Sequence, residues 1–353
     1  MVTLEEAIHG IEPIDQGKVQ EAWDHWDSLC KPLRGFGKLE EMVVQLAGIQ
    51  RTAEPKCDKR AVVIMGADNG VVEEGVTQSD SSVTIQVLEN MGERMSSVCV
   101  MSKILNADVY PVNIGSNTDG KHERIRNYVV RHGTGNIAKG PAMSREECIQ
   151  AIEVGIRVAG EMKEMGYDLI VTGEMGIGNT TTSSACVAVL FDQRAEDVTG
   201  RGAGLSSAGL QKKIAVIDRA IAVNAPDKND PIDVMSKVGG LDIAGMTGLF
   251  LGAAYYQMPA FIDGFISCIS ALFAMQLCPE TKGYMYATHC TAEPAGQLLL
   301  QGLGMEAILH AGMHLGEGTG AAAVLPLLDQ ALNVYYNLPG WKAASVEQYE
   351  HLK

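Results

Sequence analysis

The chain has 353 residues, of which 46% are hydrophobic and 20% charged, and its formal net charge is −15 at pH 7. This length and apolar content predict one large domain plus a smaller one around a sizeable core. The acidic balance argues against a nucleic acid as partner, because no basic stripe can neutralise phosphates along a duplex. The negative net charge is compatible with a small anionic ligand, because such a ligand needs only local amides and one or two cations.

The N-terminus and the cysteines both predict a cytoplasmic protein. Residues 1–7 include two glutamates, where a signal peptide has basic residues followed by an apolar run. The eight cysteines lie far apart and never form Cys-x-x-Cys, which favours reduced core thiols over disulfides or a zinc site. Pro259, Asp263 and Gly264 interrupt the apolar stretch 245–278, so we expect helix, strand and helix there and no membrane span.

Taken in chain order, residues 1–55 have no strand signal and predict helices, with a turn at 29–38. Residues 61–65 are the first continuous apolar strand, and they run into the polar, glycine-bounded segment 66–70. The stretch 83–105 predicts mostly helix. The first strand therefore ends in a polar loop that precedes a helix.

Further strands alternate with helices. Residues 108–113 predict a strand in which Pro111 favours a sheet edge, because proline cannot donate a hydrogen bond to a neighbouring strand. Ser144 and Glu147 form a capping-box pattern that opens a long helix, and this helix leads into the buried strand 168–172.

Two more strands are predicted at 260–263 and 283–288, and residues beyond 338 look like a peripheral extension. The alternation from 61 to 300 implies right-handed crossovers and a parallel sheet. We therefore predict an α/β fold in which a Rossmann-like parallel sheet is flanked by helices.

The segment 171–182 combines a strand end, a carboxylate, three glycines and several hydroxyls. Glu174 ends the strand, and Gly176 lets the backbone approach an anion. Asn179 and Thr180 open the next predicted helix, where amides and hydroxyls favour a phosphate. Because open α/β sheets bind ligands at the carboxyl ends of their strands, we predict an anion site with a carboxylate here. The alternative is an ordinary glycine-rich turn with a solvated glutamate.

A second glycine-rich loop, 199–207, precedes a helix that carries Lys212, Lys213 and Arg219. Phosphate contact is one interpretation of these cations, and a solvated helix face is the commoner one. No segment matches Gly-x4-Gly-Lys-[Ser/Thr], so a P-loop nucleotide site has no support.

Glu317 is flanked by glycines in the segment 316–320. Such glycines reduce stability and add no packing. They therefore favour a site where the backbone must come close to another group over a simple junction between helices. A partly desolvated Glu317 would serve as a general base. His310 and His314 share a helix face, but the absence of an obvious third ligand favours an ordinary surface over a metal site.

Several segments resemble the signature sequences of the nicotinate-nucleotide:dimethylbenzimidazole phosphoribosyltransferase family. The similarity runs in order from about residue 25 to 335. The segments are Gly-Glu-Met-Gly-Ile-Gly-Asn-Thr-Thr at 173–181, Ser-Lys-Val-Gly-Gly-Leu-Asp-Ile-Ala-Gly-Met-Thr-Gly at 236–248, Leu-Gly-Glu-Gly-Thr-Gly-Ala at 315–321, Gly-Asn-Ile-Ala-Lys-Gly-Pro-Ala-Met at 135–143, and the turn 31–40.

The resemblance implies a large parallel α/β domain and a small helical domain built from both chain ends, usually in a homodimer. We accordingly expect a small helical domain at 1–55 plus 325–353 and a large α/β catalytic domain at 56–324. Related phenol and p-cresol phosphoribosyltransferases are pairs of unlike subunits, so a heterodimer with a homologous subunit is the other expectation.

The resemblance also implies an activity in cobamide lower-ligand activation. Such an enzyme moves 5-phosphoribose from nicotinate mononucleotide to a base, giving an α-riboside 5′-phosphate and nicotinate. Neither a cofactor nor a metal is implied, because the leaving group is already a pyridinium. By resemblance, Glu317 is the base that takes the acceptor's proton. Glu174 is the second active-site carboxylate, which would stabilise an oxocarbenium-like ribose or orient its hydroxyls.

The same resemblance assigns the residues that bind the substrates, with the phosphate held by amides and one cation. Near the nucleotide these are Gly176, Asn179, Thr180, Gly202, Gly204 and Lys213, with Asp263 and Thr291 completing the ribose and phosphate side. The substrate-binding set further includes Ser79, Val87, His314 and Leu315.

Departures from the family pattern gather around the acceptor. Residues 68–70 are Asp-Asn-Gly instead of Asp-His-Gly, and Asp80 and Ser81 replace a usual proline and lysine. Val87 stands where glutamine is expected, with a glutamine one place earlier, and one helical residue turns a side chain by about 100 degrees. His314 replaces an arginine. We therefore predict an acceptor other than dimethylbenzimidazole: another benzimidazole, a purine or a phenol.

A different class of function is a non-catalytic nucleotide-binding subunit of a heteromeric homologue. Loss of Glu174 or Glu317 would mark such a subunit, and this sequence keeps both. If the chain has an unlike partner, we expect this chain to be the catalytic one.

Overall fold

The computed structural model describes residues 2–350. In this part of the chain, parallel strands form one six-stranded sheet in the order β3-β2-β1-β4-β5-β6. The predicted Rossmann-like sheet is thus confirmed, although the two-residue β3 was too short to give a sequence signal. The strands are β1 (Arg60–Ala67), β2 (Ala107–Gly115), β3 (Arg126–Asn127), β4 (Leu169–Met175), β5 (Ala260–Ile262) and β6 (Met285–Ala287).

The strand order reverses between β1 and β4. β1 is buried along its whole length, because it pairs with β2 on one side and β4 on the other. Its continuous apolar sequence is typical of a strand covered on both faces. Where the order reverses, the loops that follow the two neighbouring strands diverge and leave a crevice at the carboxyl edge of the sheet.

Pro111 lies in β2, opposite Ile64 of β1. β3 pairs only with Val112 and Asn113, so the outer side of β2 is unpaired at the proline. Pro111 is therefore not in an edge strand as expected, because β2 lies between β3 and β1, although no residue of β3 pairs with the proline.

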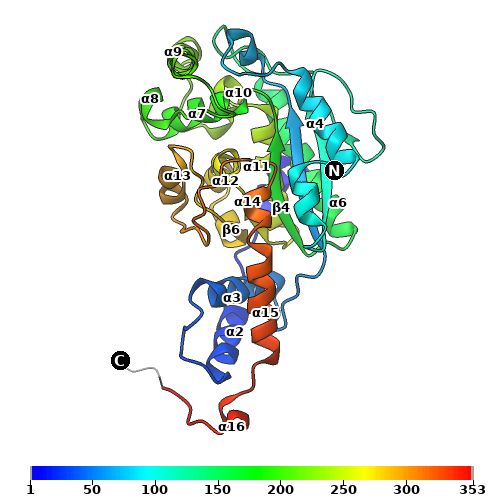
Figure 1. The fold of residues 1–353 in the computed structure, drawn as a ribbon, viewed down its shortest axis with the longest axis vertical. Helices are drawn as coiled ribbons and strands as arrows, with labels where there is room; N and C mark the ends of the chain where they lie inside the picture. Colours follow the sequence, from blue (N-terminus) through cyan, green and yellow to red (C-terminus); the bar gives the residue numbers. More distant parts are fainter. Residues whose placement is uncertain (1, 351–353) are drawn as a thin grey trace.

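Helices cover the sheet on both sides (Figure 1). α4 (Ser82–Gly92) and α5 (Ser97–Ser102) contact β2, while α11 (Leu241–Tyr255) packs against the four central strands and α12 (Phe265–Leu277) against β4 and β5. The other elements of this unit are η1 (Gly70–Glu74), α6 (Arg145–Glu164), α7 (Asn179–Leu190), α8 (Ala195–Val198), α9 (Ser207–Asn224), α10 (Pro231–Val238), η2 (Pro279–Tyr284), α13 (Gly296–Leu303) and α14 (Thr319–Ala322).

The capping box predicted at Ser144 opens α6. Ser144 Oγ accepts the Glu147 N–H at 3.1 Å, and Glu147 Oε2 accepts the Ser144 N–H at 2.8 Å. α6 then packs closely along α11, where a Cβ on Gly155 would lie 2.0 Å from the carbonyl oxygen of Gly245. The glycines therefore allow the two helix backbones to touch.

Helices from both chain ends form a group below the sheet unit in Figure 1. They are α2 (Gln16–Ser28), α3 (Lys38–Gln50), α15 (Leu325–Asn337) and α16 (Trp341–Ala344). Trp26 of α2 is fully buried, with its ring centroid 5.2 Å from that of Tyr335 in α15. α1 (Leu4–Gly10) instead packs against α6 and α11. The domain limits at residues 55 and 325 stay predictions.

The eight cysteines are unpaired and six are buried, as the sequence predicted. Within residues 2–350, no helix combines the length and the apolar character needed to cross a bilayer.

Candidate active site

A cavity of about 240 Å³ opens where the strand order reverses. It is bounded by the loop after β1, the turn after β4, the second glycine-rich loop, the end of β5 and the Glu317 segment. The corresponding residues are 76–79, 174–180, 201–203, 205, 213, 263–267, 289, 291, 293 and 314–317. Loops far apart in the sequence therefore meet in one pocket at the carboxyl edge of the sheet.

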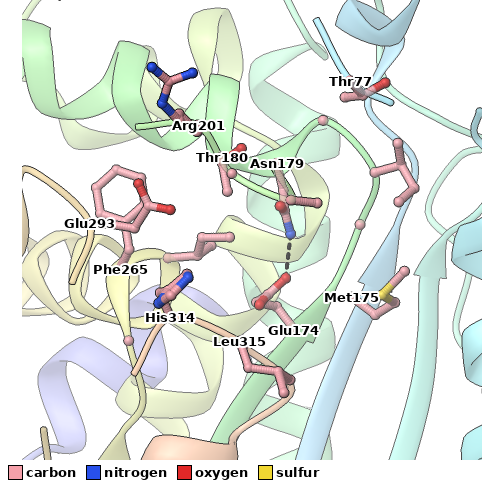
Figure 2. Close-up of a pocket in the computed structure, with 18 of the residues that line it drawn as sticks. Thr77, Glu174, Met175, Asn179, Thr180, Arg201, Phe265, Glu293, His314 and Leu315 are labelled. Carbon is pink, nitrogen blue, oxygen red and sulfur yellow. Dashed lines mark hydrogen bonds between the residues drawn. The ribbon is translucent and has the colours of Figure 1, made fainter. Parts of the chain in front are cut away.

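Glu174, near the end of β4, is half-buried in the wall of this cavity. Asn179 Nδ2, at the start of α7, donates a hydrogen bond to Glu174 Oε2 (Figure 2). Burial, and then the negative charge of Asp242, raise the pKa of Glu174 to about 8. Without a cation beside it, this carboxyl is therefore mostly protonated at neutral pH.

Asp242 is fully buried in the first turn of α11. Burial raises its pKa to about 6, against the opposing effect of hydrogen bonds from Ile243 N–H and nearby asparagine amides. Two glycines make room for the Asp242 carboxylate. A Cβ on Gly176 would lie 2.9 Å from Asp242 Oδ2, and a Cβ on Gly240 would lie 2.4 Å from Asp242 Oδ1. We did not predict a role for Asp242, although it follows the double glycine of a signature segment.

Glu317 is carried by a left-handed turn. The φ angles are 90° at Gly316, 58° at Glu317 and 77° at Gly318. A non-glycine residue in this region costs about 1–2 kcal/mol, so the surrounding structure must hold it there. Glu317 Oε2 accepts the Val98 N–H at the start of α5 at 3.5 Å, and burial raises the pKa of Glu317 above that of an ordinary glutamate.

Lys213 lies at another corner of the cavity and is 1% exposed. Its Nζ donates to Thr180 Oγ1 at 2.8 Å and to the Gly200 carbonyl at 3.2 Å. Burial lowers the pKa of Lys213 to about 8, although the charge of Glu293 partly opposes this shift. A buried cation, a hydroxyl and the first turn of α7 thus converge, and together they suit a phosphate.

The chain matches a family of known proteins over most of its length. A family model described as Phosphoribosyltransferase matches residues 11–346. The nicotinate-nucleotide–dimethylbenzimidazole phosphoribosyltransferase of Acetivibrio thermocellus is 48% identical over 324 residues, which are 92% of each chain. The enzyme of the same name from Ruminiclostridium cellulolyticum is 45% identical over 352 residues, spanning 100% of both chains. The chain belongs to this phosphoribosyltransferase family.

Solved structures agree with this assignment. The crystal structure of CobT from Thermus thermophilus matches with a TM-score of 0.89 and 32% identity, covering 94% of this chain and 100% of that one. The fold of the phosphoribosyltransferase family is thus shared over almost the whole chain.

Most of the residues predicted from the family resemblance line the cavity. They are Ser79, Glu174, Gly176, Asn179, Thr180, Gly202, Lys213, Asp263, Thr291, His314, Leu315 and Glu317. Figure 2 shows Glu174, Asn179 and Thr180 in succession along one wall, with His314 and Leu315 close to Glu174.

Val87 and Gly204 do not line the cavity in this structure. Val87 lies on α4, half-buried against the hydrophobic core, and the preceding Gln86 is exposed. The Gly204 carbonyl accepts a hydrogen bond from Gln78 Nε2, which links the glycine-rich loop to the loop after β1. The binding roles of Val87 and Gly204 stay predictions.

Two of the departures from the family pattern have local structural explanations. Asp80 Oδ1 accepts the Ser82 N–H at 2.8 Å and the Ser82 hydroxyl at 2.5 Å, so it supports the start of α4. Asn69, in place of the usual histidine, is buried and donates to the Ile177 carbonyl at 3.5 Å. His314 is exposed at the rim of the cavity, and the helix face that it was expected to share with His310 is wrong, because residues 305–316 form no helix.

Several lining residues were not predicted as site residues. Arg201 and Glu293 lie in loops without periodicity, and Figure 2 shows Glu293 beside Phe265, across the cavity from Met175. His289 directly follows the strand predicted at 283–288. Within residues 2–350, no three histidine, cysteine, aspartate or glutamate side chains converge in a way that would hold a metal ion.

Proposed function

We propose that this chain transfers 5-phosphoribose from nicotinate mononucleotide to an aromatic base and releases nicotinate. The observation that carries the proposal is the convergence of Glu174 and Glu317 on one cavity that also contains the buried cation Lys213. Two carboxylates suit a ribose that develops positive charge, and the cation suits its 5′-phosphate. The two relatives described above are named for this activity, and this chain covers 92% and 100% of their lengths.

The chemistry needs only a base and an oriented sugar. The bond from C1′ to the pyridinium nitrogen breaks with both electrons passing to nitrogen, which leaves the neutral pyridine ring of nicotinate. The acceptor attacks C1′ from the opposite face, through a ring nitrogen of a base or the hydroxyl oxygen of a phenol, giving the α-riboside, and the proton that the acceptor loses passes to Glu317. Burial raises the pKa of Glu317, which makes its carboxylate a stronger base than that of a solvated glutamate.

Glu174 is proposed to stabilise the charge on the sugar. A pyridinium next to its carboxyl favours the ionised form and lowers its pKa again. The Asn179 amide, which donates to Glu174 Oε2, fixes the direction of the carboxylate. Its negative charge then lies beside C1′ as the oxocarbenium character develops.

The phosphate is proposed to bind near Lys213, with the Thr180 hydroxyl and the backbone at Gly176 and Gly202. A Cβ on Gly202 would lie 2.9 Å from Thr180 Oγ1, so glycine keeps this corner open. Thr291, in the loop after β6, is proposed on the ribose and phosphate side.

The acceptor is proposed to enter beside Ser79, His314 and Leu315. Leu315 is 58% exposed, and an aromatic ring bound beside it would cover this apolar side chain. The names of the relatives favour dimethylbenzimidazole. The replacements at Asp80, Ser81, Val87 and His314, of which only His314 lines the cavity, favour another benzimidazole, a purine or a phenol as the second candidate.

The test is an end-point assay of the purified chain with nicotinate mononucleotide and, separately, dimethylbenzimidazole, adenine and phenol. Chromatography follows nicotinate and the riboside phosphate, and size-exclusion chromatography with light scattering reports whether the chain is the proposed homodimer. Product with any acceptor supports the proposal. If the folded protein gives no product, even when a homologous subunit from the source cell is added, the result favours the alternative that the chain is a non-catalytic nucleotide-binding subunit.

A further inference from the structure

Asp263 holds the segment that carries Glu317. It follows β5 directly, and its side chain is 5% exposed. Asp263 Oδ2 accepts the Gly318 N–H at 3.1 Å, and Oδ1 accepts the Ala321 N–H at 3.0 Å. Both oxygens are thus used by the backbone immediately after Glu317, and the carboxylate ties that backbone to the end of β5.

Asp263 is itself fixed to β4 through two hydroxyls. Its N–H donates to Ser267 Oγ at 3.1 Å, and Ser267 Oγ lies 2.5 Å from Thr172 Oγ1. Thr172 in turn donates to the Phe261 carbonyl at 2.9 Å. Because Thr172 lies in β4 two residues before Glu174, the support of the Glu317 turn is rigidly joined to the strand of the other carboxylate.

His289 closes the remaining side of Asp263. The imidazole is 3% exposed, and its Nδ1 lies 4.0 Å from Asp263 Oδ1. A Cβ on Gly320 would lie 2.0 Å from His289 Cε1, so the ring is packed directly against the segment after Glu317. The Asp263 carboxylate therefore has little room to turn away from the two N–H groups that it accepts.

We propose that Asp263 is a positioning residue, which holds the left-handed turn 316–318 and so directs the Glu317 carboxylate toward the acceptor. The role deepens the proposed function and rests on it. Glu317 has an unfavourable backbone angle, and the glycines beside it add freedom, so the turn needs an external restraint. The two hydrogen bonds to Asp263 supply that restraint, and they replace the contact with ribose that the family resemblance implied for this residue.

The test is a double-mutant cycle with Asp263→Asn and Glu317→Gln in the full chain. Asparagine keeps one acceptor, but its NH₂ group faces a backbone N–H, so the turn loosens. We expect kcat to fall about ten- to hundredfold, with KM for nicotinate mononucleotide within about twofold of wild type. The double variant should be no slower than Glu317→Gln alone, because Asp263 acts only through Glu317.

A ribose-binding role gives the opposite pattern and overturns the proposal. KM for nicotinate mononucleotide then rises, and the double variant is slower than either single variant. If circular dichroism shows that Asp263→Asn is unfolded, Asp263→Ser replaces it, because serine removes the carboxylate without placing a donor against the backbone. For Asp263→Ser, the same changes in kcat, KM and the rate of the double variant distinguish the positioning role from the ribose-binding role.

Asp230→Asn is the matched control. Asp230 Oδ1 also accepts two backbone N–H groups, those of Ile232 and Asp233, each at 3.1 Å, but at the start of α10 and away from the cavity wall. Its kcat and KM should equal those of wild type. If the wild-type chain releases no nicotinate with any acceptor, the proposed function itself is wrong. If the wild type is active and Asp263→Asn has a raised KM, only the positioning role is wrong.

Discussion

Gly316 lies directly against the carboxylate of Glu174, so that a Cβ at position 316 would lie 2.5 Å from Glu174 Oε1. On the other side of this contact, a Cβ on Gly173 would lie 2.8 Å from the backbone nitrogen of Gly318. The backbone of β4 and the turn that carries Glu317 therefore touch. The glycines beside the two glutamates are needed because both carboxylates must reach one small cavity.

Gly316→Ala should lower kcat at least tenfold, because the added methyl group displaces the Glu174 carboxylate. Gly312→Ala is the control. Both glycines have positive φ, 90° and 64°, so both substitutions add roughly 1–2 kcal/mol of backbone strain. Nothing lies within 4 Å of a Cβ at Gly312, however. Steady-state kinetics and thermal unfolding of the two variants separate the effects, and equal kcat values would contradict the expectation.

Glu317→Gln should lower kcat by about 10²- to 10⁴-fold while leaving the Kd for nicotinate mononucleotide unchanged, because the base acts on the acceptor. Titration calorimetry measures the Kd. Glu306→Gln is a suitable control, since Glu306 is exposed and pairs with Lys38 outside the cavity. A general base must be ionised, so activity is lost as pH falls through the pKa of Glu317. Because burial raises this pKa, the activity of the wild type should fall on acidification at a higher pH than an ordinary glutamate would give. This fall in activity should be absent in Glu317→Gln.

Lys213→Met should raise KM for nicotinate mononucleotide by about ten- to hundredfold, since a charge-assisted contact to phosphate contributes roughly 1.5–3 kcal/mol. The neighbouring Lys212 is exposed and outside the cavity wall, so Lys212→Met should keep the wild-type KM. The ammonium of Lys213 has a pKa lowered to about 8. KM of the wild type should accordingly rise between pH 7 and pH 9, and an unchanged KM in Lys213→Met would place the phosphate elsewhere.

Glu174→Gln should stabilise the protein at high pH even though it removes activity. The folded-state pKa of about 8 lies above the unfolded value, so this carboxyl contributes most to stability at low pH. That contribution is lost as pH rises from about 4.5 through 8. We expect the variant to gain roughly 1–3 kcal/mol over wild type at pH 8.5 and little at pH 5, measured by urea unfolding. Glu306→Gln should show no such gain, because Lys38 lowers the pKa of Glu306.

The sequence by itself determined the sheet and the two glutamates. Buried parallel strands read as continuous apolar runs, so residues 61–65 and 168–172 could be located without any knowledge of their neighbours. Glycines on both sides of Glu317 would weaken a helix or a strand, so this pattern indicated that Glu317 has a functional role. The ordered signature segments then connected these features to one chemistry.

Only the tertiary structure decided which groups support those glutamates. Asp263 lines the cavity, and its role on the ribose and phosphate side stays a prediction; its oxygens also accept the N–H groups of Gly318 and Ala321, which lie 55 and 58 positions further along the chain. Asp242, in the first turn of α11, and His289, after β6, likewise lie against segments that are distant in the sequence. Such contacts depend on the strand order around β1 and β4 and leave no periodic pattern in the local sequence, so they become visible only when the loops at the carboxyl edge of the sheet are brought together.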